Sequence, residues 1–249
     1  MRTPSTSAPI ERGDLQAHTT DSDGRDALPD MARAAEELGY EYLAITDHSQ
    51  AVRIAGGLDR LGFRRQMKRI DRLNTTLGKL TVLKGAEVDI RPDGSLDLDD
   101  ATLEALDLIL VSVHSAFDLS EREQTRRVLR AIRHPAVDIL AHPTARLIGR
   151  RGALRLDLEQ VAHVAAEQGV FLEVNAQPDR LDLDDVAIRT ALGAGATLVI
   201  STDAHAVAEL GFMHWGVDQA RRGWAGPAQV LNTRPLRELL TFLHRSRHA

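Results

Sequence analysis

Apolar and polar positions follow two alternating patterns from residue 14 almost to the C-terminus. Short apolar runs are typical of buried strands, and stretches with apolar residues three and four positions apart are typical of amphipathic helices. The runs that predict strands are 14–18, 42–46, 81–88, 108–113, 137–141, 170–174 and 196–201. The stretches that predict helices are 27–38, 58–77, 121–133, 158–168, 184–192 and 206–221.

Strands that alternate with helices predict βαβ units and therefore an α/β fold with a parallel sheet, either open and doubly wound or closed into a barrel. No glycine-rich phosphate loop follows any predicted strand, which weakens the open nucleotide-binding sheet and favours a barrel. We find no internal repeat and no linker after Gly13, so we predict one domain over residues 14–249. Residues 1–13 are expected to be a flexible lead-in, either the remnant of a linker to an upstream domain or a frayed terminus.

The composition narrows the class of protein. With 249 residues, 43% hydrophobic and 27% charged, the chain is globular rather than disordered or fibrous. It has no cysteine, so any bound metal must be held by His, Asp, Glu or amide groups. No apolar run approaches the roughly 20 residues of a membrane span, and no signal core is present, so we expect a cytoplasmic protein without membrane contact. A formal net charge of -5 argues against binding to nucleic acid through a global positive field, although a local basic rim remains open.

Five of the ten histidines lie at or shortly after the C-terminal ends of predicted strands. They are His18, His48, His114, His142 and His205. In a parallel barrel these ends open on one face, where such enzymes place their chemistry. A lone histidine is more often a cap or a hydrogen-bonded core residue, but five at equivalent positions are hard to explain that way. We therefore predict that these five share a site, and we assign no ligand role to the others.

Asp47, Glu87 and Asp203 also lie at or near strand ends. Neutral imidazoles combined with carboxylates suit zinc, manganese or iron(II) and are too rich in nitrogen for calcium or magnesium. Metals held close together by a shared carboxylate can generate hydroxide and neutralise the attacking and leaving oxygens of a phosphoester. These residues therefore predict metal-assisted phosphoester cleavage.

The order of these motifs resembles that of the polymerase-and-histidinol-phosphatase (PHP) superfamily. The matching segments are 14–20, 22–24, 45–49, 85–87, His114, 141–143 and 202–205. The resemblance covers nearly the whole chain after residue 12 and implies a distorted (β/α)7 TIM-like barrel with a three-metal centre. Segments outside the metal ligands are similar to the C-terminal PHP domain of bacterial family X DNA polymerases, namely 92–97, 142–144 with 146–151, 175–178 with 180–183, and 222–224 with 231–233.

That similarity implies a manganese-dependent 3′ to 5′ exonuclease acting on DNA 3′ ends or abasic sites. The polymerase domain is absent from this sequence, so the chain is either an excised fragment that works with an upstream polymerase domain or a stand-alone relative. Two other functions stay open: a small-molecule phosphomonoesterase of the histidinol-phosphatase kind, and a non-catalytic module that supports a polymerase. The negative charge mildly favours the phosphomonoesterase, whereas segment 146–151 and the subfamily motifs favour the nuclease by more.

Carried over residue by residue, the family pattern implies three divalent metal ions, manganese or zinc, with iron as a further option. The expected ligands are Gln16, His18, Glu87 and Asp203 for the first metal, Glu87, His114 and His142 for the second, and Asp23, His48 and His205 for the third. Glu87 is expected to bridge the first two metals. The predicted catalytic residues are Glu87, His114 and Asp203. Asp23 alone would more often be a turn former, and Asp47 is expected to orient His48 or a neighbouring ligand.

Gln16 departs from the family pattern, which has His-x-His at this point of the first strand. The two-residue spacing aims both side chains at one metal, and an amide offers that metal only a neutral carbonyl oxygen, so the first site should be weakened. Gln16 is interpreted as a natural variant that still works, an engineered inactivation or a sign of decay. We favour the first two over decay because every other ligand position is intact.

Arginines near the predicted mouth of the barrel are candidates for substrate binding. Arg146 and Arg150 come shortly after His142, and we expect them to bind substrate phosphates because a guanidinium can fork onto phosphate oxygens. Only 4% of the residues are aromatic, so few platforms for base stacking exist. Contacts to nucleic acid should therefore be mostly to its backbone.

Overall fold

A computed structural model describes residues 11–52 and 55–243, so most of the expected lead-in lies outside the described residues. Seven parallel strands follow one another in chain order around a barrel. They are β1 (Gly13–Ala17), β2 (Tyr42–Ile45), β3 (Thr81–Asp89), β4 (Leu108–Ser112), β5 (Ile139–Leu140), β6 (Phe171–Asn175) and β7 (Leu198–Ser201). Just past β1, the backbone N–H of His18 donates to the carbonyl of Ala204 at 2.8 Å and nearly closes the ring. The predicted distorted (β/α)7 TIM-like barrel is confirmed.

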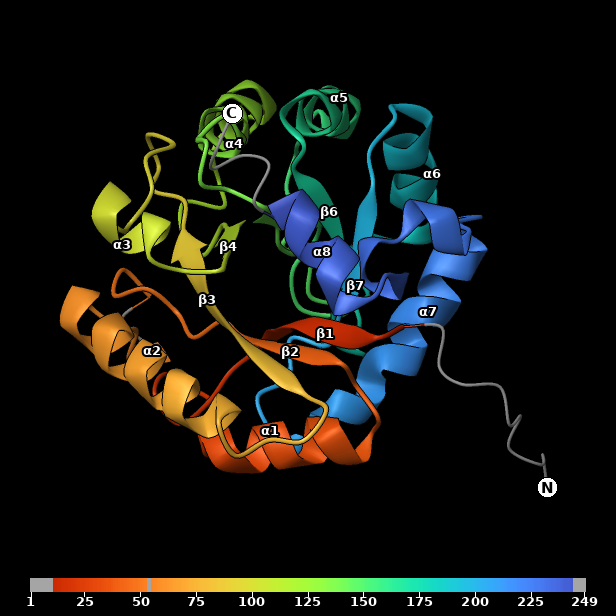
Figure 1. Cartoon of the computed structure of the whole chain (residues 1–249). Helices are drawn as coiled ribbons and strands as arrows, with labels where there is room; N and C mark the ends of the chain where they lie inside the picture. The colour runs from red at the N-terminus through yellow and green to blue at the C-terminus, as the bar shows by residue number, and fades with distance from the viewer. Residues whose placement is uncertain (1–10, 53–54, 244–249) are drawn as a thin grey trace.

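Helices surround the strands, and α8 lies across one end of the barrel (Figure 1). They are α1 (Leu28–Glu37), α2 (Arg60–Asn74), α3 (Asp100–Glu104), α4 (Glu121–Ile132), α5 (Leu158–Gln168), α6 (Asp185–Gly193), α7 (Met213–Arg222) and α8 (Leu236–Leu243). The short α3 was not predicted. None of the helices in the described part of the chain is long and apolar enough to cross a membrane.

The predicted helix over 206–221 is wrong in its first half. Residues Val207–Phe212 form a 3-10 helix, η2, and the α-helix begins only at Met213. Glu209 in η2 accepts a hydrogen bond from the backbone N–H of His205 at 2.8 Å. This contact folds the segment back toward the end of β7, so η2 stays beside the polar end of the barrel.

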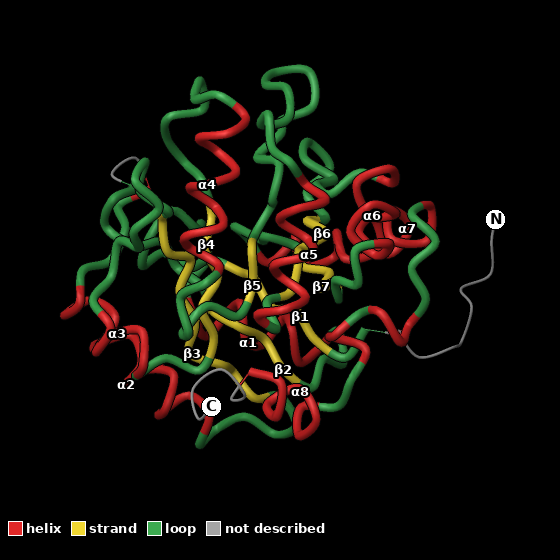
Figure 2. Tube along the Cα trace, turned by 90° about the horizontal axis from the view of Figure 1, so that it is seen from above, coloured by secondary structure: helices red, strands yellow, loops and turns green. Residues whose placement is uncertain are grey.

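Side chains of the strands alternate between the barrel interior and the layer beneath the helices. On β4, Leu108 and Leu110 belong to the inner core, whereas Ile109 and Val111 belong to the outer core. Leu239 of α8 is fully buried in the inner core, and the first residue of α8 is tied to the residue before β2 by a hydrogen bond from the Leu236 N–H to Glu41. Figure 2 shows α8 near that end of the strands. The N-terminal end of the barrel is therefore filled with apolar side chains, and polar groups gather at the other end.

Side-chain caps fix where the helices begin. Asp59, Asp157 and Asp184 each accept a backbone N–H from the first turn of α2, α5 and α6. Ser120 and Glu123 form a capping box at the start of α4. Each cap satisfies N–H groups that have no partner within the helix, and so defines the length of the loop between strand and helix. These loops carry much of the candidate site.

Candidate metal centre

The predicted ligands converge at the C-terminal end of the barrel. Three groups of residues could each hold a metal ion, because the ligand atoms within each group lie within 4.8 Å of one another. The groups are His18, Asp23, His48 and His205, then His48, Glu87 and His114, and then His18, Glu87 and Asp203. Shared members join the three groups into one continuous cluster. The topology explains this, because parallel strands bring their C-terminal ends to one face.

An irregularity in β1 turns Gln16 into this cluster. Asp14 pairs with Leu43 and Ala17 with Ile45, so three steps along β1 match two steps along β2 and one extra residue is inserted. Such a bulge changes the face on which a side chain lies. Gln16 donates from Nε2 to Oε2 of Glu87 at 2.9 Å, and its own Oε1 is buried without a hydrogen-bond partner.

Glu87 of β3 is the hub of the cluster. Its Oε1 lies 2.9 Å from His142 Nε2 and 3.4 Å from His114 Nε2. Its Oε2 lies 3.3 Å from His18 Nε2 and 3.5 Å from His48 Nδ1. Burial opposes the charge on Glu87, yet the surrounding imidazoles, with His48 the strongest, hold its pKa well below the ordinary value. A carboxylate that reaches four rings through both oxygens is well placed to bridge metal ions.

The second part of the cluster comes from the loop after β1 and from the ends of β2 and β7. Asp23 lies 3.5 Å from His48 Nε2 through one oxygen and 3.5 Å from His205 Nε2 through the other. The ring of His18 stacks against both His48 and His205, with centroids 4.5 and 4.4 Å apart. Burial opposes a charge on these rings, but hydrogen bonds to Asp203 and Glu87 raise the pKa of His18 well above its ordinary value. Asp23 and Asp203 likewise raise the pKa of His205. Because a metal binds the neutral ring, metal binding here would release protons.

Asp203 connects the cluster to β7 and β6. Its Oδ1 lies 3.1 Å from His18 Nε2, and its Oδ2 accepts from Asn175 Nδ2 at 3.0 Å. Burial opposes its charge, but the hydrogen bond to His18 and the nearby charge of His205 lower the pKa of Asp203. The backbone at Asp203 and at His142 is left-handed, with φ of 52° and 28°. Non-glycine residues adopt this conformation rarely, and it is kept where the surroundings fix it, as they do at functional sites.

The residues present fit a metal. Four ring or amide atoms in the cluster are buried and have no hydrogen-bond partner, whereas buried polar atoms are normally paired. They are Gln16 Oε1, His18 Nδ1, His48 Nδ1 and His142 Nδ1. Unpaired nitrogen donors beside carboxylates make a ligand set for zinc, manganese or iron(II). The described part of the chain thus offers a ligand set that fits metal binding.

The structure groups the predicted ligands in nearly the expected sets. His18, Glu87 and Asp203 lie together, as do Asp23, His48 and His205. In the remaining group, His48 joins Glu87 and His114, and His142 contacts Glu87 at 2.9 Å. The assignment of each residue to a particular metal stays a prediction.

The carboxylate of Asp47 holds the loop that contains Asp23 and makes no hydrogen bond to His48 within the described residues. Its carboxylate accepts from the backbone N–H and the hydroxyl of Thr19, from the Ser22 hydroxyl and from the Gln66 side chain. These bonds hold the 19–24 turn against α2. The carboxylate thereby positions a neighbouring ligand, one of the two roles expected of it.

Glu173 was not singled out in the sequence, although it accepts a hydrogen bond from a predicted ligand. Its Oε2 accepts from the backbone N–H of His142 at 2.7 Å and from the side chain of Asn175 at 3.2 Å. Burial, followed by the charge of Asp203, raises the pKa of Glu173 well above its ordinary value. Its place at an inward position of β6, two residues before Asn175, was the available signal.

The two arginines expected to bind substrate phosphates have different surroundings, and their role in phosphate binding stays a prediction. Arg146 donates to the carbonyls of Arg180 and Leu181 at 2.7 and 2.6 Å and pairs with Asp184, so its guanidinium holds the loop after β6. Arg150 is exposed in the loop after β5. The sequence reasoning missed Arg180, whose Nε lies 3.5 Å from Asp203 and whose buried Nη1 has no hydrogen-bond partner. The similar segment 175–183 contained it, but nothing in its spacing marked it as part of the site.

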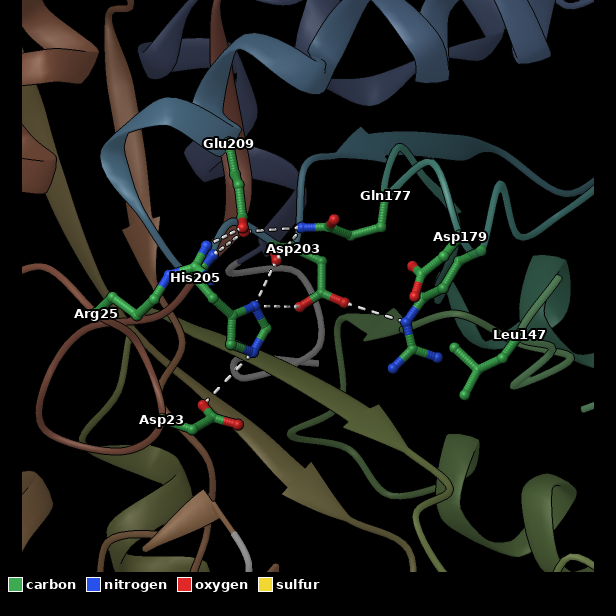
Figure 3. A pocket seen from close by; sticks show the side chains of 9 residues that line it. Asp23, Arg25, Leu147, Gln177, Asp179, Asp203, His205 and Glu209 are labelled. Carbon is green, nitrogen blue, oxygen red and sulfur yellow. Dashed lines mark hydrogen bonds and ion pairs between the residues drawn. The ribbon is translucent and has the colours of Figure 1, made fainter. Parts of the chain in front are cut away.

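An open pocket of about 320 Å³ adjoins the cluster. Figure 3 shows His205 between Asp23 and Asp203, with Leu147 across the pocket from Arg25. The pocket is lined by Asp23, Arg25, Leu147, Gln177, Asp179, Arg180, Asp203, His205 and Glu209. Cations and candidate metal ligands therefore face the same open space, as a site for an anionic ester requires.

A (β/α)7 barrel with a buried His, Asp and Glu cluster at its C-terminal end defines a metal-dependent hydrolase. The PHP domain family model matches residues 14–177, and the chain belongs to that family as a metal-dependent phosphoesterase.

Three comparisons place the chain among known proteins. It is 44% identical over 235 residues to the DNA polymerase/3′-5′ exonuclease PolX of Bacillus subtilis (strain 168), covering 94% of this chain and 41% of that protein. The chain thus spans about two fifths of the length of this relative. It is 32% identical over 166 residues to a "Probable phosphatase" of Acetivibrio thermocellus, covering 65% of this chain and 64% of that protein.

The third likeness is to a solved structure, histidinol phosphate phosphatase of Lactococcus lactis, complexed with zinc, L-histidinol and phosphate. The TM-score is 0.55 at 14% identity, with 84% of this chain and 94% of that chain covered. At this identity the likeness supports the fold alone.

Proposed function

We propose that this chain is a 3′ to 5′ nuclease that processes DNA 3′ ends, including ends near abasic sites. The observation that carries the proposal is the 44% identity to the Bacillus PolX across 94% of the chain. The pocket beside the cluster supports it, because Arg25 and Arg180 line its wall and can meet a charged backbone. An arginine with a free donor next to a carboxylate-rich centre offsets the repulsion that a phosphate would otherwise meet.

The reaction is hydrolysis of a terminal phosphodiester. Water adds to phosphorus, the bond from phosphorus to the 3′ oxygen of the shortened strand breaks, and that oxygen takes a proton. Metal ions held by the cluster would supply Lewis acidity and activate the water. Arg180 orients the phosphate from the wall of the pocket, and Asp203 fixes Arg180 at 3.5 Å. Asn175 holds the other side of the same carboxylate, so the orientation is built into β6 and β7.

A small-molecule phosphatase is the second candidate. It is favoured by the 32% identity to the Acetivibrio protein and by a pocket large enough for a small ester. The two candidates differ in what lies outside the pocket, since a nucleic acid needs contacts beyond the scissile phosphate.

A substrate panel separates these functions. The protein with manganese is incubated with a 5′-labelled single strand, a duplex that holds an abasic site and histidinol phosphate. If the chain is a nuclease, we expect shortened DNA strands and a kcat/KM for DNA far above that for histidinol phosphate. A preference for histidinol phosphate would establish the second candidate. No turnover of any substrate would favour a non-catalytic module that supports a polymerase.

A further inference from the structure

A tight turn in the loop after β5 carries two apolar residues at its tip. The backbone N–H of Leu147 donates to the carbonyl of Arg151 at 2.9 Å, and Arg151 donates back to Leu147 at 2.8 Å. Gly149 has a φ of +74° at the turn, a conformation that L side chains rarely adopt. Ile148, beside it, is 51% exposed.

The tip is held firmly from three sides. Arg146 fixes its base to the loop after β6 through three hydrogen bonds. The Ile148 N–H donates to the carbonyl of Asp179 at 2.6 Å. The guanidinium of Arg151 lies over the ring of Phe117, 3.9 Å from its centroid, and donates to the carbonyl of Ala145. The turn is therefore held in place by polar contacts, and the side chain of Ile148 is exposed to solvent.

The tip is continuous with the candidate active site. Leu147 lines the same pocket as Asp203 and His205, and Ile148 is the next residue outward. Figure 3 shows Leu147 beside Asp179 at the rim opposite Asp23. Arg150 is exposed within the same turn. An apolar tip with a neighbouring cation matches a ligand that has flat apolar bases and a charged backbone.

We propose that Leu147 and Ile148 form a wedge that packs against the bases at a DNA 3′ end and keeps the terminal nucleotide unpaired. The inference rests on the proposed nuclease function and adds a specificity element to it. Apolar side chains inserted between base steps are a known way to unstack a duplex. Here the wedge would separate the terminal base from its partner while its phosphate lies in the pocket, and Arg150 would contact the strand outside.

The test compares two variants at the tip with a control elsewhere. Ile148→Ser removes the apolar contact, and Ile148→Leu retains it. Leu38→Ser is the matched control, because Leu38 is 45% exposed at the far end of α1. Each is assayed with manganese on a duplex with a paired 3′ end, on one with a mismatched 3′ end, and on thymidine 5′-monophosphate p-nitrophenyl ester.

The wedge predicts that Ile148→Ser lowers kcat/KM on the paired end by at least about fivefold. The loss on the mismatched end should be smaller, because that end is already open, and the small ester should be unaffected. Ile148→Leu and Leu38→Ser should resemble the wild type. An equal loss on all three substrates, or none on the paired end, overturns the wedge. A changed oligomeric state without substrate selectivity would assign the tip to a protein contact instead. If the wild type cleaves the small ester but no DNA, the nuclease proposal itself has failed.

Discussion

Gln16 Nε2 donates to Glu87 Oε2 at 2.9 Å, on the same buried carboxylate that His18, His48, His114 and His142 approach. The opposite amide orientation would set two acceptor oxygens against each other, so the observed one is favoured. Gln16 therefore steadies Glu87 through its nitrogen and leaves Oε1 as the atom that can face a metal. The position keeps a link to the cluster although it lacks an imidazole.

Gln16→His should strengthen the first metal site. An imidazole is a better donor to manganese or zinc than an amide oxygen, so we expect manganese affinity to rise by on the order of tenfold. The gain in rate should be clearest at low manganese concentration. Metal analysis and a manganese titration of activity check this. A variant that binds no more metal and is no faster throughout the titration would show that the amide limits neither metal binding nor turnover. It would favour the interpretation of Gln16 as a sign of decay.

The two arginines of the β5 loop should separate into different roles. Arg146→Ala removes two hydrogen bonds to carbonyls and the contact with Asp184, so it should lower the free energy of unfolding by about 2 kcal/mol. Arg150→Ala should leave stability unchanged and reduce the slope of log affinity for DNA against log salt by about one. Urea unfolding and DNA binding at several salt concentrations measure both. If Arg146→Ala is fully stable and has a reduced slope of log affinity for DNA against log salt, Arg146 binds phosphate instead.

Asp182 should make the folded state less stable as the pH rises. It is fully buried, and burial raises its pKa from 3.8 to about 6, although Thr144 donates to it from both N–H and hydroxyl. Between pH 4 and 6 the unfolded chain loses this proton while the folded chain retains it, so the free energy of unfolding falls with rising pH in that window.

Asp182→Asn keeps an acceptor for the Thr144 N–H and removes the titration. Its stability relative to the wild type should therefore increase from pH 4 to 6 and then level off. Urea unfolding of both proteins in a chelator, from pH 4 to 7.5, measures the difference. A difference that is constant over this range would contradict a raised pKa at Asp182.

The sequence predicts the barrel and the ligand cluster well because both depend on position along strands. Five histidines at strand ends must meet once the strands are parallel and closed, whatever the loops do. Arg180 and Arg146 could not be assigned in this way, since their roles depend on the path of two loops. The carbonyls at 180 and 181 take up the donors of Arg146, and Arg180 is left facing Asp203. The bulge that turns Gln16 inward is likewise invisible in a two-residue spacing.

The most direct test of the account is metal-dependent shortening of DNA from the 3′ end, compared between the wild type and His114→Ala. His114 contacts Glu87 at 3.4 Å yet is partly exposed, so its loss should leave the fold intact. His163→Ala is the control, because His163 is exposed on α5 and pairs only with Glu167 among the described residues. We predict that the wild type and the control shorten a 5′-labelled strand with manganese and stop in a chelator. His114→Ala should bind less metal and lose at least about a hundredfold in rate. A folded His114→Ala with wild-type metal content and wild-type rate would contradict the assignment of the cluster as the catalytic centre.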